Sequence, residues 1–429
     1  MFGLFLVSLT FLALVLYELR RRVPIWPLSP VWLVIGGYLT MGFVGRYAMR
    51  WAKAPWGQGF LFITFSDNAL DRTLLWFIFI TTSFALGALL WVWVSQRPDL
   101  PVELSAKLRR QGGGIWLLVA VGVLALVIIG VGPENVVYRT VYLTSSVKWA
   151  KILGSAMTPI GVGLCGYIAF GFESTPIRTG AALIALGYFL VDFSLATRAM
   201  ALVPVLFALG AFCAQPRGRS VRVLFYGGIL AAPLLMPFPL VLRDLSEQGL
   251  IPFMSALSSG MKLLKHQDIL PQVFGNVLMS FPLTTYVARQ HPIDTSVLLT
   301  CLNPMPGFMT DWYQEVPHLM VNPFTPFNTL GMLMNFGAPV GGGFYLAVGF
   351  YFAHADWKIR RELQQGRVLR GLVLFGFLAL FLLMTMQYML RAAVRLIYYA
   401  LTFEILTGLL LSETSAPIRR MRPARALPQ

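Results

Sequence analysis

The sequence has few charged residues and few cysteines. Of its 429 residues only 12% are charged, whereas 57% are hydrophobic and 14% are aromatic. A soluble chain of this length could not bury so much apolar surface, so the composition predicts a protein that lies in a lipid bilayer. The three cysteines are far apart and show neither a disulfide framework nor the spacing of metal ligands.

Several well-known functional motifs are also absent. The sequence contains no Walker loop, no dinucleotide-binding glycine fingerprint, no HExxH and no GxSxG. These absences argue against an ATP-driven pump, a dehydrogenase and a zinc protease. We therefore expect neither a cofactor nor a metal.

The sequence is instead rich in long apolar segments. Eleven approach the length that crosses a bilayer, and they cover residues 2–18, 29–45, 73–95, 114–132, 152–172, 179–197, 199–214, 222–241, 327–355, 369–388 and 393–411. Arginines follow the first segment and do not precede it, which indicates a retained span and not a cleaved signal. Because neither a repeat nor a polar linker divides the chain, we expect one transmembrane domain over residues 1–429. The predicted fold is all-α and polytopic, with about eleven transmembrane helices.

Positive charge is distributed unevenly between the two sides of this topology. The net charge of +16 might indicate a nucleic-acid partner, but most of the cations cluster in short connectors between apolar segments. If the N-terminus is outside, 20 of the 34 lysines and arginines fall on the inner side. The positive-inside rule then puts the C-terminus in the cytoplasm and the long loop of residues 242–326 outside.

This long loop is the expected place for chemistry, because functional residues concentrate in long connections. It carries three of the four histidines and the sequence Asn-Pro-Met-Pro at 303–306. It ends within a second proline-rich sequence, Asn-Pro-Phe-Thr-Pro-Phe-Asn at 322–328. Two apolar stretches, residues 250–264 and 274–288, are too short to span a bilayer. We expect them to form short helices that lie in the membrane interface or dip into it from outside.

Cations on the outer side predict a binding site for a negatively charged substrate. The residues assigned to diphosphate or substrate binding are Arg198, Arg289, Arg391, Arg395 and His291. Arg391 and Arg395 share one helix face at i and i+4, so their guanidinium groups could grip a diphosphate through paired hydrogen bonds. The alternative is that each arginine extends from a helix end to the lipid headgroups.

A cluster of acids and an imidazole in the loop predicts a catalytic site. Asp311, Glu315 and His318 lie close together in the sequence, and a carboxylate near an imidazole suits general-base work on a sugar hydroxyl. A solvated loop histidine is the alternative reading. Two further carboxylates, Asp192 and Glu404, fall inside apolar segments, where a charge is costly and is therefore either functional or paired.

Three elements of the sequence carry a resemblance to a known family. They are Asn-Pro-Met-Pro at 303–306, the proline-rich segment 323–326 and Phe-Gly-Ala-Pro-Val-Gly at 336–341. Together with the many spans and the single large loop, they resemble the Wzy-type O-antigen and exopolysaccharide polymerases. Thr197-Arg198-Ala199 similarly resembles a Ser/Thr-Arg-Gly segment of that family. Family members often carry a glutamate just before the Phe-Gly element, where this chain has Asn328, Met332 and Asn335.

The resemblance implies a metal-independent membrane glycosyltransferase of the GT-C type. Such an enzyme would polymerise undecaprenyl-diphosphate-linked oligosaccharide repeat units at the periplasmic face of the bacterial inner membrane. Its partners would be these lipid-linked substrates, the bilayer and a regulator of polysaccharide chain length, but no nucleic acid. Two alternatives stay open: an O-antigen ligase-like transferase, and a transporter or flippase for a lipid-linked or anionic solute. A transporter would be expected to show internal repeats and polar groups at mid-membrane depth.

Overall fold

The computed structural model describes residues 2–26, 28–51, 65–96, 113–141, 145–215, 218–235, 238–243, 245–258, 278–290, 292–310, 312–322, 325–365 and 367–412. Helices make up nearly all of these residues. The sheet within them has two short antiparallel strands, β1 (Met320–Asn322) and β2 (Thr325–Pro326).

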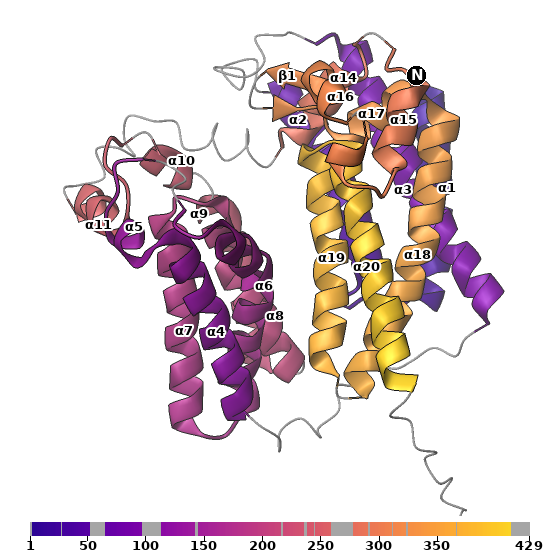
Figure 1. Cartoon of the computed structure of the whole chain (residues 1–429). Coiled ribbons are helices and arrows are strands. Elements are labelled where there is room, and N and C mark those ends of the chain that lie inside the picture. Colours follow the sequence, from indigo (N-terminus) through magenta and orange to yellow (C-terminus); the bar gives the residue numbers. More distant parts are fainter. Residues whose placement is uncertain are drawn as a thin grey trace, which may run out of the picture.

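The helices form two groups that stand side by side (Figure 1). The central group comes from the middle of the chain and contains α4 (Gly113–Val131), α5 (Pro133–Val137), α6 (Lys148–Gly171), α7 (Thr175–Ser194), η2 (Arg198–Leu202), α8 (Val203–Ala214), α9 (Arg219–Leu235), α10 (Phe238–Arg243) and α11 (Leu250–Ser258). The terminal group contains α1 (Phe2–Arg22), α2 (Pro30–Trp51), α3 (Asp67–Ser95), α14 (Ser280–Val287), α15 (Thr295–Leu302), η3 (Gly307–Met309), α16 (Trp312–Glu315), η4 (Val316–Leu319), β1, β2, α17 (Thr329–Phe336), α18 (Ala338–Gln364), α19 (Val368–Gln387) and α20 (Leu390–Ser412).

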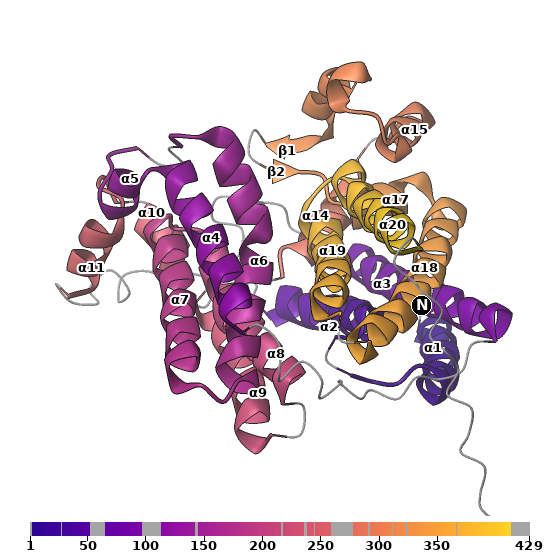
Figure 2. The same ribbon diagram turned by 60° about the horizontal axis from the view of Figure 1, so that its bottom comes forward.

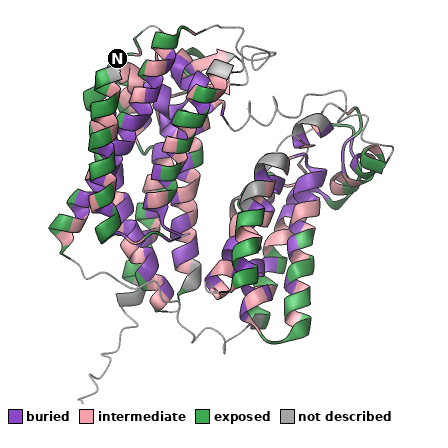
Figure 3. Ribbon diagram, turned by 180° about the vertical axis from the view of Figure 1, so that it is seen from behind, coloured by how far each residue is buried: buried purple, intermediate pink, exposed green. Residues whose placement is uncertain are grey.

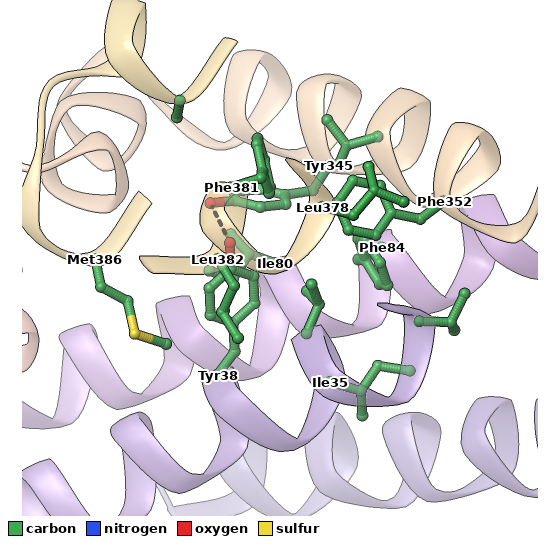
Figure 4. Packing of buried hydrophobic residues seen from close by; sticks show 14 of the residues in the cluster. Ile35, Tyr38, Ile80, Phe84, Tyr345, Phe352, Leu378, Phe381, Leu382 and Met386 are labelled. Atoms are coloured by element: carbon green, nitrogen blue, oxygen red, sulfur yellow. Dashed lines mark hydrogen bonds between the residues drawn. The ribbon is translucent and has the colours of Figure 1, made fainter. Parts of the chain in front are cut away.

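The core of the terminal group lies between α2, α3, α18 and α19. Its fully buried aromatic residues include Tyr38, Phe84, Tyr345, Phe352 and Phe381 (Figure 4). The hydroxyl of Tyr38 lies 3.2 Å from the hydroxyl of Tyr345 and 2.9 Å from that of Thr385. The polar atoms that the aromatic residues bring into the core are thereby paired with one another, as buried polar groups must be.

Several helices are long and apolar enough to cross a membrane. Among the described residues these are Gly3–Arg22, Asp67–Ser95, Gly114–Val131, Thr175–Ser194, Arg370–Gln387 and Leu390–Leu409, and the bent pair Lys148–Ser155 with Met157–Gly171 would add a seventh. Many of their exposed residues are large and apolar, which suits contact with lipid (Figure 3). The predicted all-α fold with several potential spans is confirmed. The number eleven stays a prediction, because α2, α8, α9 and α18 match predicted segments but are shorter or less apolar than these six.

Short elements gather at one end of the helices, which we call the loop end. Helices α10, α11 and α14 to α17 lie there, together with the N-terminus (Figure 1). The predicted loop of residues 242–326 supplies most of them. Helix α11 covers part of the apolar stretch 250–264 and α14 covers most of 274–288. Residues 259–264 and 274–277 lie outside the described residues.

Candidate functional site

Helix α14 lies inside the terminal group and not on its surface. Seven of its eight residues are buried. The ring of Phe281 stacks on Phe77 of α3 with 5.8 Å between the ring centroids, and the Thr285 hydroxyl lies 2.9 Å from that of Thr73. Because later residues of α14 meet earlier residues of α3, the two helices are antiparallel. Helix α14 therefore begins among the long helices and ends near the first turns of α3, as expected for a short apolar segment that dips among them.

A pocket of about 240 Å³ opens where α14 ends beside the start of α3. It is lined by Ser66, Asn68, Ala69, Arg72, Thr73, Thr285, Ala288, Arg289 and Met334. We call it the Arg72–Arg289 pocket, because both of its charged lining residues are arginines. Both are exposed, and neither forms an ion pair with another residue in the described part of the chain. The pocket thus combines two available guanidinium groups with hydroxyl and amide side chains.

The first turn of α3 adds positive potential to this pocket. The Ser66 hydroxyl accepts a hydrogen bond from the amide of Ala69 and caps the helix. The amide groups at a helix start and the helix dipole both favour a bound anion. Asp67 and Asp71 of the same helix bind Arg46, at 3.0 Å and 2.8 Å. Arg46 offsets one of these two negative charges. The positive charge of Arg72 and Arg289 therefore exceeds the remaining negative charge by one.

Two asparagines fix α14, and with it the position of Arg289. The Nδ2 atom of Asn335 donates to the carbonyls of Val287 (3.3 Å) and Gln290 (3.5 Å), and its Oδ1 accepts from the amide of Ile293 (2.8 Å). This residue therefore holds the turn that carries Arg289. Neither asparagine is assigned a role by sequence reasoning, although both stand where the resembling family often carries a glutamate.

Asn328 performs the same task at the other end of α14. It is fully buried, and its Nδ2 lies 3.2 Å from the Ser280 carbonyl, 2.8 Å from the Thr284 hydroxyl and 3.2 Å from the Met386 carbonyl. Its Oδ1 also accepts from the amide of Gly331 at 3.0 Å and caps α17. One side chain thus joins α14, α17 and α19.

Replacing Asn328 by alanine should therefore destabilise the protein more than replacing Asn303, whose side chain accepts one bond from Met305 at 2.9 Å. Loss of the buried Asn328 partners should lower the free energy of unfolding by about 2–4 kcal/mol, since unsatisfied buried groups cost about 1–3 kcal/mol each. Thermal unfolding of the purified variants in detergent measures the difference. Equal shifts for Asn328→Ala and Asn303→Ala would contradict it.

The Phe-Gly element at 336–341 serves as a turn and a packing site. Gly337 has φ +99°, a conformation that favours glycine, and it separates α17 from α18. A Cβ atom on Gly341 would lie 2.3 Å from the ring of Trp76. The two glycines therefore let α18 approach α3 closely while α17 turns Met334 toward the pocket.

Arg391 holds the loop instead of facing solution. Its guanidinium donates to the carbonyls of Thr300 and Met305 and lies 5.0 Å from the centre of the Trp312 ring. The residue is 1% exposed. Farther along α20, the hydroxyl of Tyr398 donates to the carbonyl of Leu302. Arg391 and Tyr398 together fasten α15 and the Asn-Pro-Met-Pro turn to α20.

The residues that the sequence assigns to diphosphate binding belong to different elements of the structure. Arg289 lines the pocket, Arg391 and the half-buried Arg395 lie on α20, and Arg198 begins η2 in the central group. His291 lies outside the described residues. The second arginine of the pocket, Arg72, is missed by sequence reasoning because it stands near the start of an apolar segment with two aspartates beside it.

Two residues of the predicted catalytic cluster follow Trp312, which contacts Arg391. Asp311 is outside the described residues, Glu315 is half-buried at the end of α16, and His318 is exposed in η4. Burial raises the pKa of the Cys301 thiol to about 11, and the negative charge of Glu315 acts in the same direction. Glu315 is therefore within electrostatic range of α15. No group of three or more possible metal ligands occurs in the described part of the chain.

The two carboxylates of the apolar segments, Asp192 and Glu404, have hydrogen-bond partners. Glu404 on α20 is 8% exposed and accepts from Lys358 (2.7 Å) and Tyr351 (3.0 Å) of α18, with His354 at 3.2 Å. One carboxylate oxygen of Asp192 lies 3.1 Å from the hydroxyl of Thr197. The ion pair with Lys358 supports the structural reading of Glu404.

No protein-family model, curated protein or solved structure matches the chain. The fold and the site define an almost entirely helical protein. Its described residues include six helices able to span a membrane and, at the loop end, a pocket with two arginines.

Proposed function

We propose that this protein is a membrane glycosyltransferase that polymerises undecaprenyl-diphosphate-linked oligosaccharide repeat units. The observation that carries the proposal is the Arg72–Arg289 pocket, which lies at one end of apolar helices. Its two arginines form no ion pair with any residue that the structure describes. A lipid diphosphate needs such a place, because its charged group stays at the membrane surface while its chain stays in the bilayer. Guanidinium groups also fit phosphate oxygens better than ammonium groups do.

The proposed reaction transfers a glycan from one lipid carrier to another. A hydroxyl of the acceptor sugar attacks the anomeric carbon of the donor, the bond from that carbon to the diphosphate oxygen breaks, and undecaprenyl diphosphate leaves. Arg72 and Arg289 stabilise the charge that develops on the leaving group. The hydroxyl proton passes to a base, for which Asp311, Glu315 and His318 are the candidates.

One observation favours a second candidate, a transporter or flippase for a lipid-linked or anionic solute. Glu404, Lys358 and His354 form a cluster of ionisable side chains between α18 and α20, and ionisable groups within a bilayer often mark transport pathways. A ligase would share the pocket and the chemistry of the polymerase but would use a different acceptor.

Purified protein incubated with synthetic lipid-linked repeat units tests the proposal. A polymerase yields lipid-linked glycans of two or more repeat units, seen by mass spectrometry, without a nucleotide or an added metal. A ligase joins the glycan only when lipid A core is supplied. Substrate that stays at one repeat unit under both conditions would leave the transporter as the better explanation.

The proposal places the loop end in the periplasm, with eleven spans and a cytoplasmic C-terminus. Reporter fusions after Arg110 and Arg222 should then show cytoplasmic activity, and a fusion near Lys265 should show periplasmic activity, because the dense clusters of cations resist translocation. Cytoplasmic activity at Lys265 would place the Arg72–Arg289 pocket on the wrong side of the membrane.

A further inference from the structure

We infer that α15 and the turn that follows it form a hairpin seated in the lipid interface of the leaflet at the loop end. This lipid-contact surface consists of Leu299, Met305, Met309 and Tyr313, which are 71%, 49%, 57% and 68% exposed. The inference does not depend on the proposed function. Figure 2 shows α15 on the outer side of the terminal group, near α17 and α20.

The depth of the hairpin follows from its two attachments to α20. Arg391, the second residue of α20, binds the carbonyls of Thr300 and Met305. Tyr398 binds the carbonyl of Leu302 and lies eight residues after the start of the helix, roughly 12 Å along its axis. Helix α15 therefore points its C-terminal end along α20 toward the opposite end of the bundle. Its last turn lies beside the first two turns of a helix that is able to span the membrane.

The surface continues into an apolar face of α20. Leu401 and Ile405 follow Tyr398 by three and seven residues, which places them on the same helix face. Both are exposed. The hairpin thus covers the first turns of this face of α20, and the later turns of the same face are exposed. Because α20 is a candidate span, lipid that contacts its exposed turns also contacts the hairpin.

Several backbone polar groups of the hairpin form hydrogen bonds within the protein, which suits an environment with little water. The carbonyls of Thr300, Leu302 and Met305 accept from α20 side chains, and the amide of Met305 donates to the Asn303 side chain. The amide of Asn303 donates to Leu299, and prolines at 304 and 306 have no amide hydrogen to satisfy. A segment in contact with lipid must pair its polar backbone groups internally. Exposed apolar side chains on such a backbone fit lipid better than water.

Site-directed spin labelling in nanodiscs tests the inference. Single cysteines are placed at Leu299, Met305 and Met309, with Ile405 as the lipid control and Thr295, one turn before Leu299 on the same face, as the solvent control. The native cysteines are buried, so labelling of the parent protein gives the background. Spin labels at the three test sites should collide more often with oxygen than with a water-soluble nickel chelate, as the label at Ile405 should. The label at Thr295 should collide more often with the nickel chelate.

Two outcomes would overturn the inference. If the nickel chelate reaches the test sites as readily as Thr295, the hairpin stands in water. If neither reagent reaches them, another protein or a second copy of this chain covers the surface. Because Leu299, Met305 and Met309 are all exposed, at least one label should leave the fold intact, which thermal unfolding of each labelled variant checks.

Discussion

Replacing Arg289 by lysine should slow polymerisation nearly as much as replacing it by alanine. The Arg72–Arg289 pocket is expected to hold a leaving diphosphate whose charge grows in the transition state, and a lysine ammonium cannot donate the paired, planar hydrogen bonds of a guanidinium. Losing one such contact should lower the rate on the order of 10²–10³-fold. The measurement is the initial rate of polymer formation by each purified variant at saturating lipid-linked substrate.

A matched control is available at the other end of the helices. Arg21 lies in the last turn of α1, has an exposed side chain and pairs with Glu18. The Arg21→Lys variant should therefore keep the polymerisation rate of the parent protein. The polymerisation rate of Arg72→Lys should fall as far as that of Arg289→Lys, because both side chains line one pocket. Near-normal rates for Arg72→Lys and Arg289→Lys would mean that these arginines only reach toward headgroups, and the pocket would lose its proposed role.

Replacing Arg391 by alanine should release α15 from α20 and abolish most of the activity. Two carbonyls lose a charged donor, the Trp312 ring loses its cation, and the site is only 1% exposed. Hydrogen bonds to charged groups contribute about 1.5–3 kcal/mol each, so several kcal/mol of local stability should be lost. Hydrogen exchange measured by mass spectrometry should rise across residues 295–306.

This experiment decides between two roles for Arg391. The sequence assigns it to the diphosphate, whereas the structure shows it bound to the loop. If exchange across 295–306 stays at the level of the parent protein while polymerisation is lost, Arg391 acts on the substrate directly. Arg395→Ala is the matched comparison, since this half-buried residue lies one turn away on the same helix and should leave the exchange of α15 unchanged.

Patterns within single segments predicted the fold better than the site. Long apolar runs identify the helices because a helix forms its backbone hydrogen bonds within its own segment. The identification therefore does not depend on which other segments pack against it. The length of the apolar stretch containing α14 also predicts that it cannot span a bilayer. Its burial against Phe77 and Thr73 depends on α3, about two hundred residues away, and no local pattern reveals that contact.

The site depends on such distant contacts. Arg289 could be proposed because it is a cation on the predicted outer side, but Arg72 becomes its neighbour only when α14 packs on α3. Arg391 was identified for the same reason as Arg289, yet its carbonyl partners lie about ninety residues earlier in the chain. In the sequence, Asn328 and Asn335 differ from the pattern of the family that the chain resembles. Their role, which is to hold α14 through hydrogen bonds, is visible only in the folded chain.

The most direct test is to locate the diphosphate on the wild-type protein. An undecaprenyl diphosphate analogue with a photoreactive group next to the phosphates can be crosslinked in nanodiscs and mapped by peptide mass spectrometry. Crosslinks should fall in residues 66–73 and 285–289 and should disappear when unlabelled undecaprenyl diphosphate is added in excess. Crosslinks that are displaced by the competitor but map to α20 or to the central group, with none in these two segments, would contradict the assignment of the Arg72–Arg289 pocket.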